Sequence, residues 1–120
     1  MSVRATANRS PAVSAADLDR LHAAYELRNP DEIMSYLAEH QELVPLLIEG
    51  RRQINHFFAE GVPVSLSLDT DPEEGDQGLY VRILSGMTAE LSDERLARMW
   101  HQWWFKQKPK LPSQLFFDAL

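Results

Sequence analysis

The fold is decided by the stretch VPVSLSL at residues 62–68, where the hydrophobic pattern changes from a helical period to a period of two. Its valines and leucines alternate with a proline and two serines. Such alternation is typical of a β-strand with one buried face and one solvated face. A second alternating stretch follows at residues 79–83, so the two together predict an antiparallel hairpin.

The segment at residues 69–78 joins the two predicted strands and is rich in acidic and turn-forming residues. Its first carboxylates are spaced like calcium ligands, but the glycine comes one position late and Tyr80 stands where a bidentate glutamate belongs. We therefore expect a solvated loop that binds no metal and no cofactor. The loop is predicted to be a docking surface for a basic partner. Its carboxylates are Asp69, Asp71, Glu73, Glu74 and Asp76.

Three helices are predicted before this hairpin. Ser14 is a capping residue for a first helix over about 15–28. Asn29 can cap a second, short helix, in which Pro30 suits the first helical position. A third helix has the clearest amphipathic pattern and is expected from near residue 43 to the glycine at position 61.

A fourth helix and a closing strand are predicted after the hairpin. Ser92 is the expected cap of this helix, and Trp104 falls beside its apolar stripe, where an exposed tryptophan would anchor a partner. The apolar tail at 114–120 is short enough to be a third strand. The chain thus predicts an α+β fold with helices packed on one face of a small antiparallel sheet of two or three strands.

Length and charge limit the function. A chain of 120 residues fits one domain, here expected over 14–120, with a disordered tail over 1–13. The formal net charge of -6 opposes nonspecific binding of nucleic acid and favours a partner with a basic surface. The sequence has no cysteine and no apolar run near the roughly 20 residues that span a bilayer, so we expect a cytoplasmic protein.

Catalytic patterns are weak. No two of the four histidines form an i, i+4 pair, which leaves no helical metal motif. Arg51 and His56 match the R-x4-H pattern of HEPN-type ribonucleases, in which arginine and histidine act on an RNA phosphate. Five residues on a helix turn through about 500°, so the two side chains would lie about 140° apart. A ribonuclease is therefore the weaker alternative.

A second alternative is a nucleic-acid-binding module. Lys106, Lys108 and Lys110 follow the tryptophans of the predicted fourth helix. Basic residues interleaved with aromatic ones can bind single strands by stacking and by phosphate contacts. This hypothesis predicts salt-dependent binding that weakens when the three lysines are removed.

Several short motifs, taken together in their order and spacing, resemble a family of short prokaryotic proteins of unknown function. In that family a helix ends in an aromatic residue before a strand, a "DPE" turn leads to a second strand, a "WW" lies in a late helix, and a "KLFIDxEF"-like strand closes the chain. This chain departs from the pattern at its basic segment 106–109 and by its early end. The matching motifs are LAEH at 37–40, Phe57-Phe58, DPE at 71–73, Leu79-Tyr80-Val81, Trp103-Trp104 and LFFD at 115–118.

The resemblance implies an interaction role. Members of that family occur in two-gene modules beside a small HEPN-like protein, which implies an antitoxin-like or accessory partner. We therefore expect a non-catalytic protein–protein interaction module that occludes a small ribonuclease-type protein. A homodimer is compatible with this expectation, because a small sheet leaves edges that pairing can cover.

Overall fold

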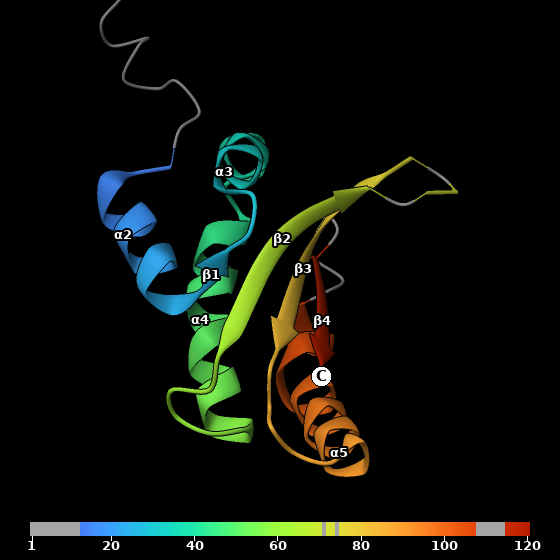
Figure 1. Cartoon of the computed structure of the whole chain (residues 1–120). Helices are drawn as coiled ribbons and strands as arrows, with labels where there is room; N and C mark the ends of the chain where they lie inside the picture. The colour runs from blue at the N-terminus through green and yellow to red at the C-terminus, as the bar shows by residue number, and fades with distance from the viewer. Residues whose placement is uncertain (1–12, 71, 74, 108–114) are drawn as a thin grey trace, which may run out of the picture.

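The computed structural model describes residues 13–70, 72–73, 75–107 and 115–120 (Figure 1). The short element η1 is a π-helix that continues α5, and α6 continues η1. The elements in chain order are α2 (Ala15–Ala24), β1 (Glu26–Leu27), α3 (Pro30–Glu39), α4 (Leu43–Phe57), β2 (Val64–Thr70), β3 (Gln77–Ile83), α5 (Ala89–Met99), η1 (Trp100–Trp104), α6 (Phe105–Gln107) and β4 (Leu115–Ala119).

The described strands form one mixed sheet in the order β1-β2-β3-β4. The predicted α+β class is confirmed, and so is the antiparallel pair β2–β3. The prediction of an antiparallel sheet of two or three strands is wrong, because β1 pairs with β2 and β4 pairs with β3, both in parallel. Parallel neighbouring strands must be joined by long connections, so a pattern within one short stretch of sequence does not predict that they pair.

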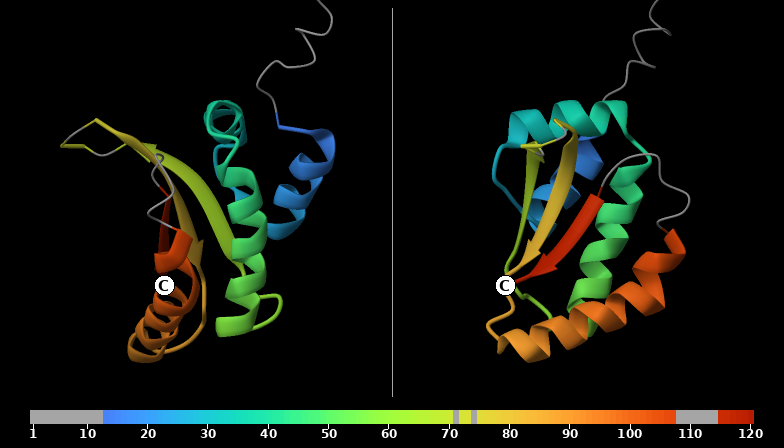
Figure 2. Two further views of the ribbon diagram at one scale, coloured as in Figure 1. Left: turned by 180° about the vertical axis from the view of Figure 1, so that it is seen from behind. Right: turned by 90° about the vertical axis from the view of Figure 1, so that its right-hand side faces the viewer.

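The strand register places the apolar side chains on one face of the sheet. Leu66 lies opposite Val81, and Val81 lies opposite Phe117. Leu66 and Val81 are fully buried, and helix α4 packs on the same face, since its Gly50 lies against Phe117. Figure 2 shows α4 running alongside the strands, with α5 crossing its lower end. The opposite face of the sheet carries polar and aromatic side chains. The predicted solvation of this face is wrong at Ser65 and Ser67, which are both buried at 6% exposure.

The free edge of β2 is closed by the segment that follows α2. Beyond β1, the Arg28 N–H donates to the Leu66 carbonyl. The Asn29 amide group then donates to the Leu68 carbonyl at 3.0 Å, and its oxygen accepts the Leu68 N–H at 3.1 Å. Asn29 thereby imitates one more residue of a strand, and it makes no capping bond to α3. The predicted capping role of this side chain is wrong.

Three predicted helix boundaries are also wrong, and one of them is the end of α4, which lies at Phe57 and not at the glycine at position 61. The first helix ends at Ala24 and not near residue 28, because Tyr25 is extended (φ -134°, ψ 150°) and leads the chain into β1. The last long helix begins at Ala89, three residues before Ser92, with Thr88 as its cap. Ser92 is only 1% exposed, and its hydroxyl bonds to that of Ser85. The predicted cap at Ser14 is confirmed, since its hydroxyl accepts the Asp17 N–H.

The π-helix η1 changes which tryptophans are buried. The Phe105 N–H bonds to the Trp100 carbonyl five residues back, so this turn holds one more residue than an α-helical turn. As a result the consecutive residues Trp103 and Trp104 are both buried, at 8% and 3% exposure. The expectation of an exposed Trp104 is wrong. Gly50 of α4 packs closely against this arrangement, since a Cβ there would lie 3.4 Å from the Trp103 ring, in van der Waals contact.

Candidate protein-interaction site

An apolar pocket lies between α5–η1 and the strand β4. Its volume is about 340 Å³, and no described residue of β3 lines it, so it opens at the outer side of β4. The lining is aliphatic and aromatic apart from Asp93 at one end. We call it the aromatic pocket. Its lining residues are Asp93, Leu96, Ala97, Met99, Trp100, Trp104, Leu115, Phe116 and Phe117.

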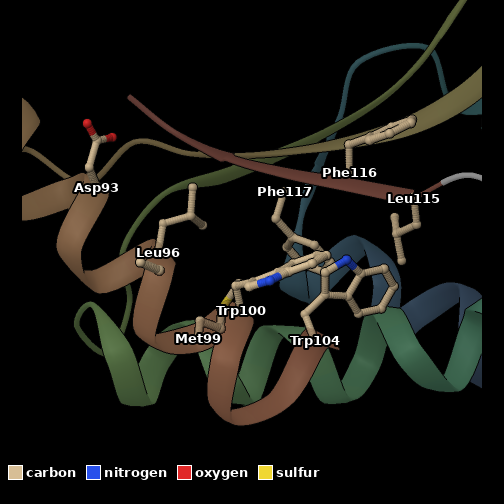
Figure 3. Close-up of a pocket in the computed structure, with 9 residues that line it drawn as sticks. Asp93, Leu96, Met99, Trp100, Trp104, Leu115, Phe116 and Phe117 are labelled. Atoms are coloured by element: carbon tan, nitrogen blue, oxygen red, sulfur yellow. The ribbon is translucent and has the colours of Figure 1, made fainter. Parts of the chain in front are cut away.

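The two tryptophans form the floor of this pocket. Figure 3 shows Trp100 and Trp104 reaching from the helix toward β4, with Phe117 and Leu115 pointing back at them and Phe116 on the other side of the strand. The rings of Trp104 and Phe117 meet edge to face at 5.0 Å between centroids. Because Trp104 is buried and packed, the floor is a fixed surface.

Beside the pocket runs the outer edge of β4. The Leu120 N–H donates to the Ile83 carbonyl at 2.8 Å, and the Leu120 carbonyl accepts from Ser85. Because bonding alternates along a parallel strand, the even-numbered residues of β4 bond to β3. The backbone groups of Leu115, Phe117 and Ala119 therefore face away from the sheet. Within the described part of the chain no strand pairs with this edge, which we call the β4 edge.

Among the described residues, the β4 edge is guarded at one point only. The Asp118 carboxylate accepts the N–H of Ala119 at 2.9 Å, so that outward donor is occupied. A charged residue of this kind discourages unwanted pairing at a sheet edge. The backbone groups of Leu115 and Phe117 lie at the end of the strand that borders Trp104, and they have no such guard among the described residues. This is the part of the edge that lies beside the aromatic pocket.

The predicted acidic loop is shorter than expected. Strand β2 extends to Thr70 and β3 begins at Gln77, so Asp69 belongs to a strand. Glu73 and Asp76 are exposed on the part of the hairpin that projects beyond the helices (Figure 1). The predicted docking residues Asp71 and Glu74 lie outside the described residues.

Asp69 is held on the face of the sheet that the helices leave open. Its carboxylate accepts from the Arg82 guanidinium at 3.0 Å and from the Ser67 hydroxyl at 3.2 Å. Arg82 also donates to Ser67 at 2.7 Å and lies over the Tyr80 ring. These contacts use the Asp69 carboxylate in a closed, neutral network, so Asp69 is less available to a partner than the exposed Asp76.

Arg51 and His56, the predicted ribonuclease pair, lie in different surroundings. Arg51 lines an open recess of about 510 Å³ with Tyr25 and His22, and His56 is not among the residues that line it. His56 is exposed and meets the ring of Phe57 edge-on. Burial lowers the pKa of Arg51. Among the described residues, Arg51 and His56 do not line one common pocket, and the ribonuclease alternative stays a prediction.

Tyr25 makes the free energy of unfolding depend on pH in the alkaline range. Its hydroxyl is buried and donates to the Leu47 carbonyl, and burial raises its pKa well above the ordinary value of 10.0. Above about pH 10 the unfolded chain loses this proton and the folded chain keeps it, so stability falls as the pH rises. We expect the midpoint of thermal unfolding to fall less steeply between about pH 9.5 and 11 in Tyr25→Phe than in the native chain. Parallel slopes would contradict this.

The structure bears on three further predictions: the nucleic-acid-binding lysines, metal binding and a membrane span. Lys106 is exposed on α6, whereas Lys108 and Lys110 lie outside the described residues. Among the residues that the structure describes, no group of three or more histidine or acidic side chains is arranged to hold a metal ion. No helix in the same part of the chain is both long and apolar enough to cross a membrane.

Neither the aromatic pocket nor the β4 edge was predicted from the sequence. They are formed by three segments: α5, the π-turn and the last strand. The hydrophobic pattern of each segment predicts that segment alone and not its contact with the other two. One signal was available, since the tail LFF at 115–117 has apolar residues on both faces of a strand that ends its sheet. An edge strand that is apolar on both faces indicates contact beyond the sheet.

Comparisons with family models, with curated proteins and with solved structures found no match to this chain.

Proposed function

We propose that this chain is a non-catalytic protein-binding module that takes up an extended segment of a partner protein at the β4 edge. The observation that carries the proposal is the unpaired edge of β4 running directly beside an apolar pocket of about 340 Å³. We call the two together the β4 groove.

The two parts of the β4 groove supply different kinds of binding energy. Outward N–H and carbonyl groups of Leu115 and Phe117 can bond to the backbone of an added strand, whatever its sequence. A neighbouring pocket then selects the side chains that alternate toward it. The pocket volume lies within the range of sites that bind small ligands or single anchoring side chains.

The finer proposal is that the partner has a basic surface and is a small ribonuclease-type protein, which this chain occludes in an antitoxin-like role. Three observations support it: the net charge of -6, the exposed carboxylates of Glu73 and Asp76 on the projecting hairpin, and the resemblance of the sequence motifs. Acidic surfaces raise the rate of association with basic partners and are sensitive to salt.

The test is an affinity capture from the native host lysate with the tagged full-length chain, at low and high salt and with and without nuclease treatment. We expect one stoichiometric protein that survives nuclease treatment, is identified by mass spectrometry and is weakened by salt. A ribonuclease assay on the captured protein, with and without the chain, then tests the antitoxin-like role.

Other outcomes of the capture decide among the alternatives. Prey that disappears after nuclease treatment favours the nucleic-acid-binding hypothesis, which replacement of Lys106, Lys108 and Lys110 by glutamine then tests. An empty capture in both salt conditions contradicts the protein-binding proposal.

A further inference from the structure

We infer that the β4 groove is specific for an extended segment with apolar residues at one end and two consecutive basic residues at the other. This inference rests on the proposed function and names the chemistry of the partner segment. It follows from the order in which the walls of the groove change from aromatic to acidic along β4.

The pairing geometry of a sheet fixes where each side chain of an added strand points. A residue that pairs with Leu115, Phe117 or Ala119 has its side chain on the same face as these residues, toward α5 and η1. A residue that pairs with Phe116 or Asp118 points to the open face of the sheet. This alternation holds whether the added strand is parallel or antiparallel to β4.

The helix and the strand run past each other in opposite directions. The Ser85 hydroxyl bonds both to Ser92, near the start of α5, and to the carbonyl of Leu120, at the end of β4. At the other end of the groove, Trp104 lies beside Leu115 (Figure 3). The Leu115 end is therefore bounded by tryptophan, and the Ala119 end is bounded by the first turns of α5, where Asp93 lies.

The first three positions of the segment require apolar side chains. Those that pair with Leu115 and Phe117 enter the aromatic pocket, whose floor is Trp100 and Trp104. The position between them lies on the open face against Phe116, which already stacks on Tyr80 at 4.9 Å between ring centroids. An aliphatic or aromatic residue there extends this stack.

The next two positions favour cations through their side chains, and at Ala119 the added strand lies alongside without a bond from the Ala119 N–H, which the Asp118 carboxylate accepts. The position that pairs with Asp118 lies on the open face beside that exposed carboxylate, and the position that pairs with Ala119 points to the helix side, toward Asp93. Among the described residues, Asp93 is the only charged one that lines the aromatic pocket. Both arginines of α5 are engaged with other groups, since Arg98 is paired with Glu94 at 3.8 Å and Arg95 donates to the Phe57 carbonyl at 2.9 Å. Two adjacent lysines or arginines therefore meet one carboxylate each, on opposite faces of the sheet.

A second copy of this chain does not supply such a segment. Pairing of β4 with β4 of another molecule brings LFFDA against LFFDA, which offers apolar residues and no basic residue. Each chain also carries a net charge of -6, so two copies repel each other at low salt. Charge complementarity selects a basic segment of a different protein.

The experiment is selection of random nine-residue peptides displayed on phage, with the full-length chain as bait in about 50 mM salt. Ala97→Arg, which places a cation at the mouth of the pocket, is the bait for counter-selection. We expect enriched peptides to carry three consecutive apolar residues followed or preceded by two basic ones. Replacing the two basic residues by glutamine in a synthetic peptide should weaken binding at least tenfold, and Asp93→Asn should weaken binding of the unmodified peptide about three- to fivefold, with both effects reduced by salt.

Failure of the inference and failure of the proposed function give different results. Peptides that bind the native chain and not Ala97→Arg, but that lack the basic pair, overturn the inferred specificity and leave the β4 groove as a protein-binding site. Peptides that bind both baits equally overturn the inference together with the proposed site. A selection without any enriched peptide overturns the inference, because a linear segment is then not sufficient for binding.

Discussion

Replacing Trp104 with alanine is expected to lower the free energy of unfolding by about 3–5 kcal/mol, the largest effect of any single substitution considered for this chain. The side chain is 3% exposed, and its ring packs against Trp103 at 5.5 Å and Phe117 at 5.0 Å between centroids. Truncation removes most of this contact and leaves a cavity between η1 and β4. A loss of this size is a large fraction of the stability of a typical domain.

The measurement is thermal unfolding followed by circular dichroism. For a chain of this length the loss corresponds to a midpoint lower by roughly 10–20 °C. Phe105→Ala is the matched control, because the neighbouring ring is 57% exposed and its removal should shift the midpoint by no more than about 3 °C. Trp104→Phe, which keeps part of the contact, should fall between them. If Trp104→Ala unfolds like the control, Trp104 is the exposed side chain that the α-helical pattern predicts, and the π-turn is not present in solution.

Replacing Ala97 with arginine is expected to weaken partner binding at the β4 groove at least tenfold without changing the fold. Ala97 is exposed on α5 and lines the aromatic pocket. An arginine there occupies the mouth of the pocket and brings a positive charge beside Asp93, where the partner segment is proposed to place its own cation. Steric exclusion and repulsion act in the same direction, and both raise the rate of dissociation.

Three controls separate binding from folding. Ala16→Arg makes the same substitution on an exposed residue of α2, which does not line the pocket, and should leave binding within about twofold. Ala97→Ser, which keeps a small side chain, should do the same. The midpoints of thermal unfolding of all three variants should lie within about 3 °C of the native chain, as expected for exposed positions. Equal capture of the partner by Ala97→Arg and Ala16→Arg would place the interaction elsewhere on the molecule.

The local patterns of the sequence were sufficient for the central hairpin. Period-two alternation at 62–68 and 79–83 predicted the pair β2–β3, because every second residue there meets the same helical layer. The helix α4 and the start of α3 also followed from apolar spacing and from proline. The closing strand β4 was predicted from its composition, although its direction was not.

Partners that are distant in the sequence decided the features that were missed. Strand β1 has two residues and exists because the stretch 26–29 bonds to β2, about 40 residues later. Ser92 is an attractive cap by residue type, but Ser85 binds its hydroxyl inside the structure. Trp104 was misplaced because one extra residue in the turn at η1 rotates everything that follows it. The β4 groove is formed by α5, η1 and β4, whose residues are adjacent only in space.

The central claim, that an extended segment pairs with β4, is tested most directly by residue-resolved amide hydrogen exchange of the full-length chain, free and bound to the partner protein or to a selected peptide. In the free chain, the amides of Phe116, Asp118 and Leu120 should exchange slowly, because they bond to β3, and those of Leu115 and Phe117 should exchange fast. Binding should slow Leu115 and Phe117 at least tenfold, as expected for new backbone hydrogen bonds. Unchanged exchange at these two amides, with protection appearing instead around Glu73 and Asp76, would show that the partner docks on the acidic hairpin and would contradict strand addition at β4.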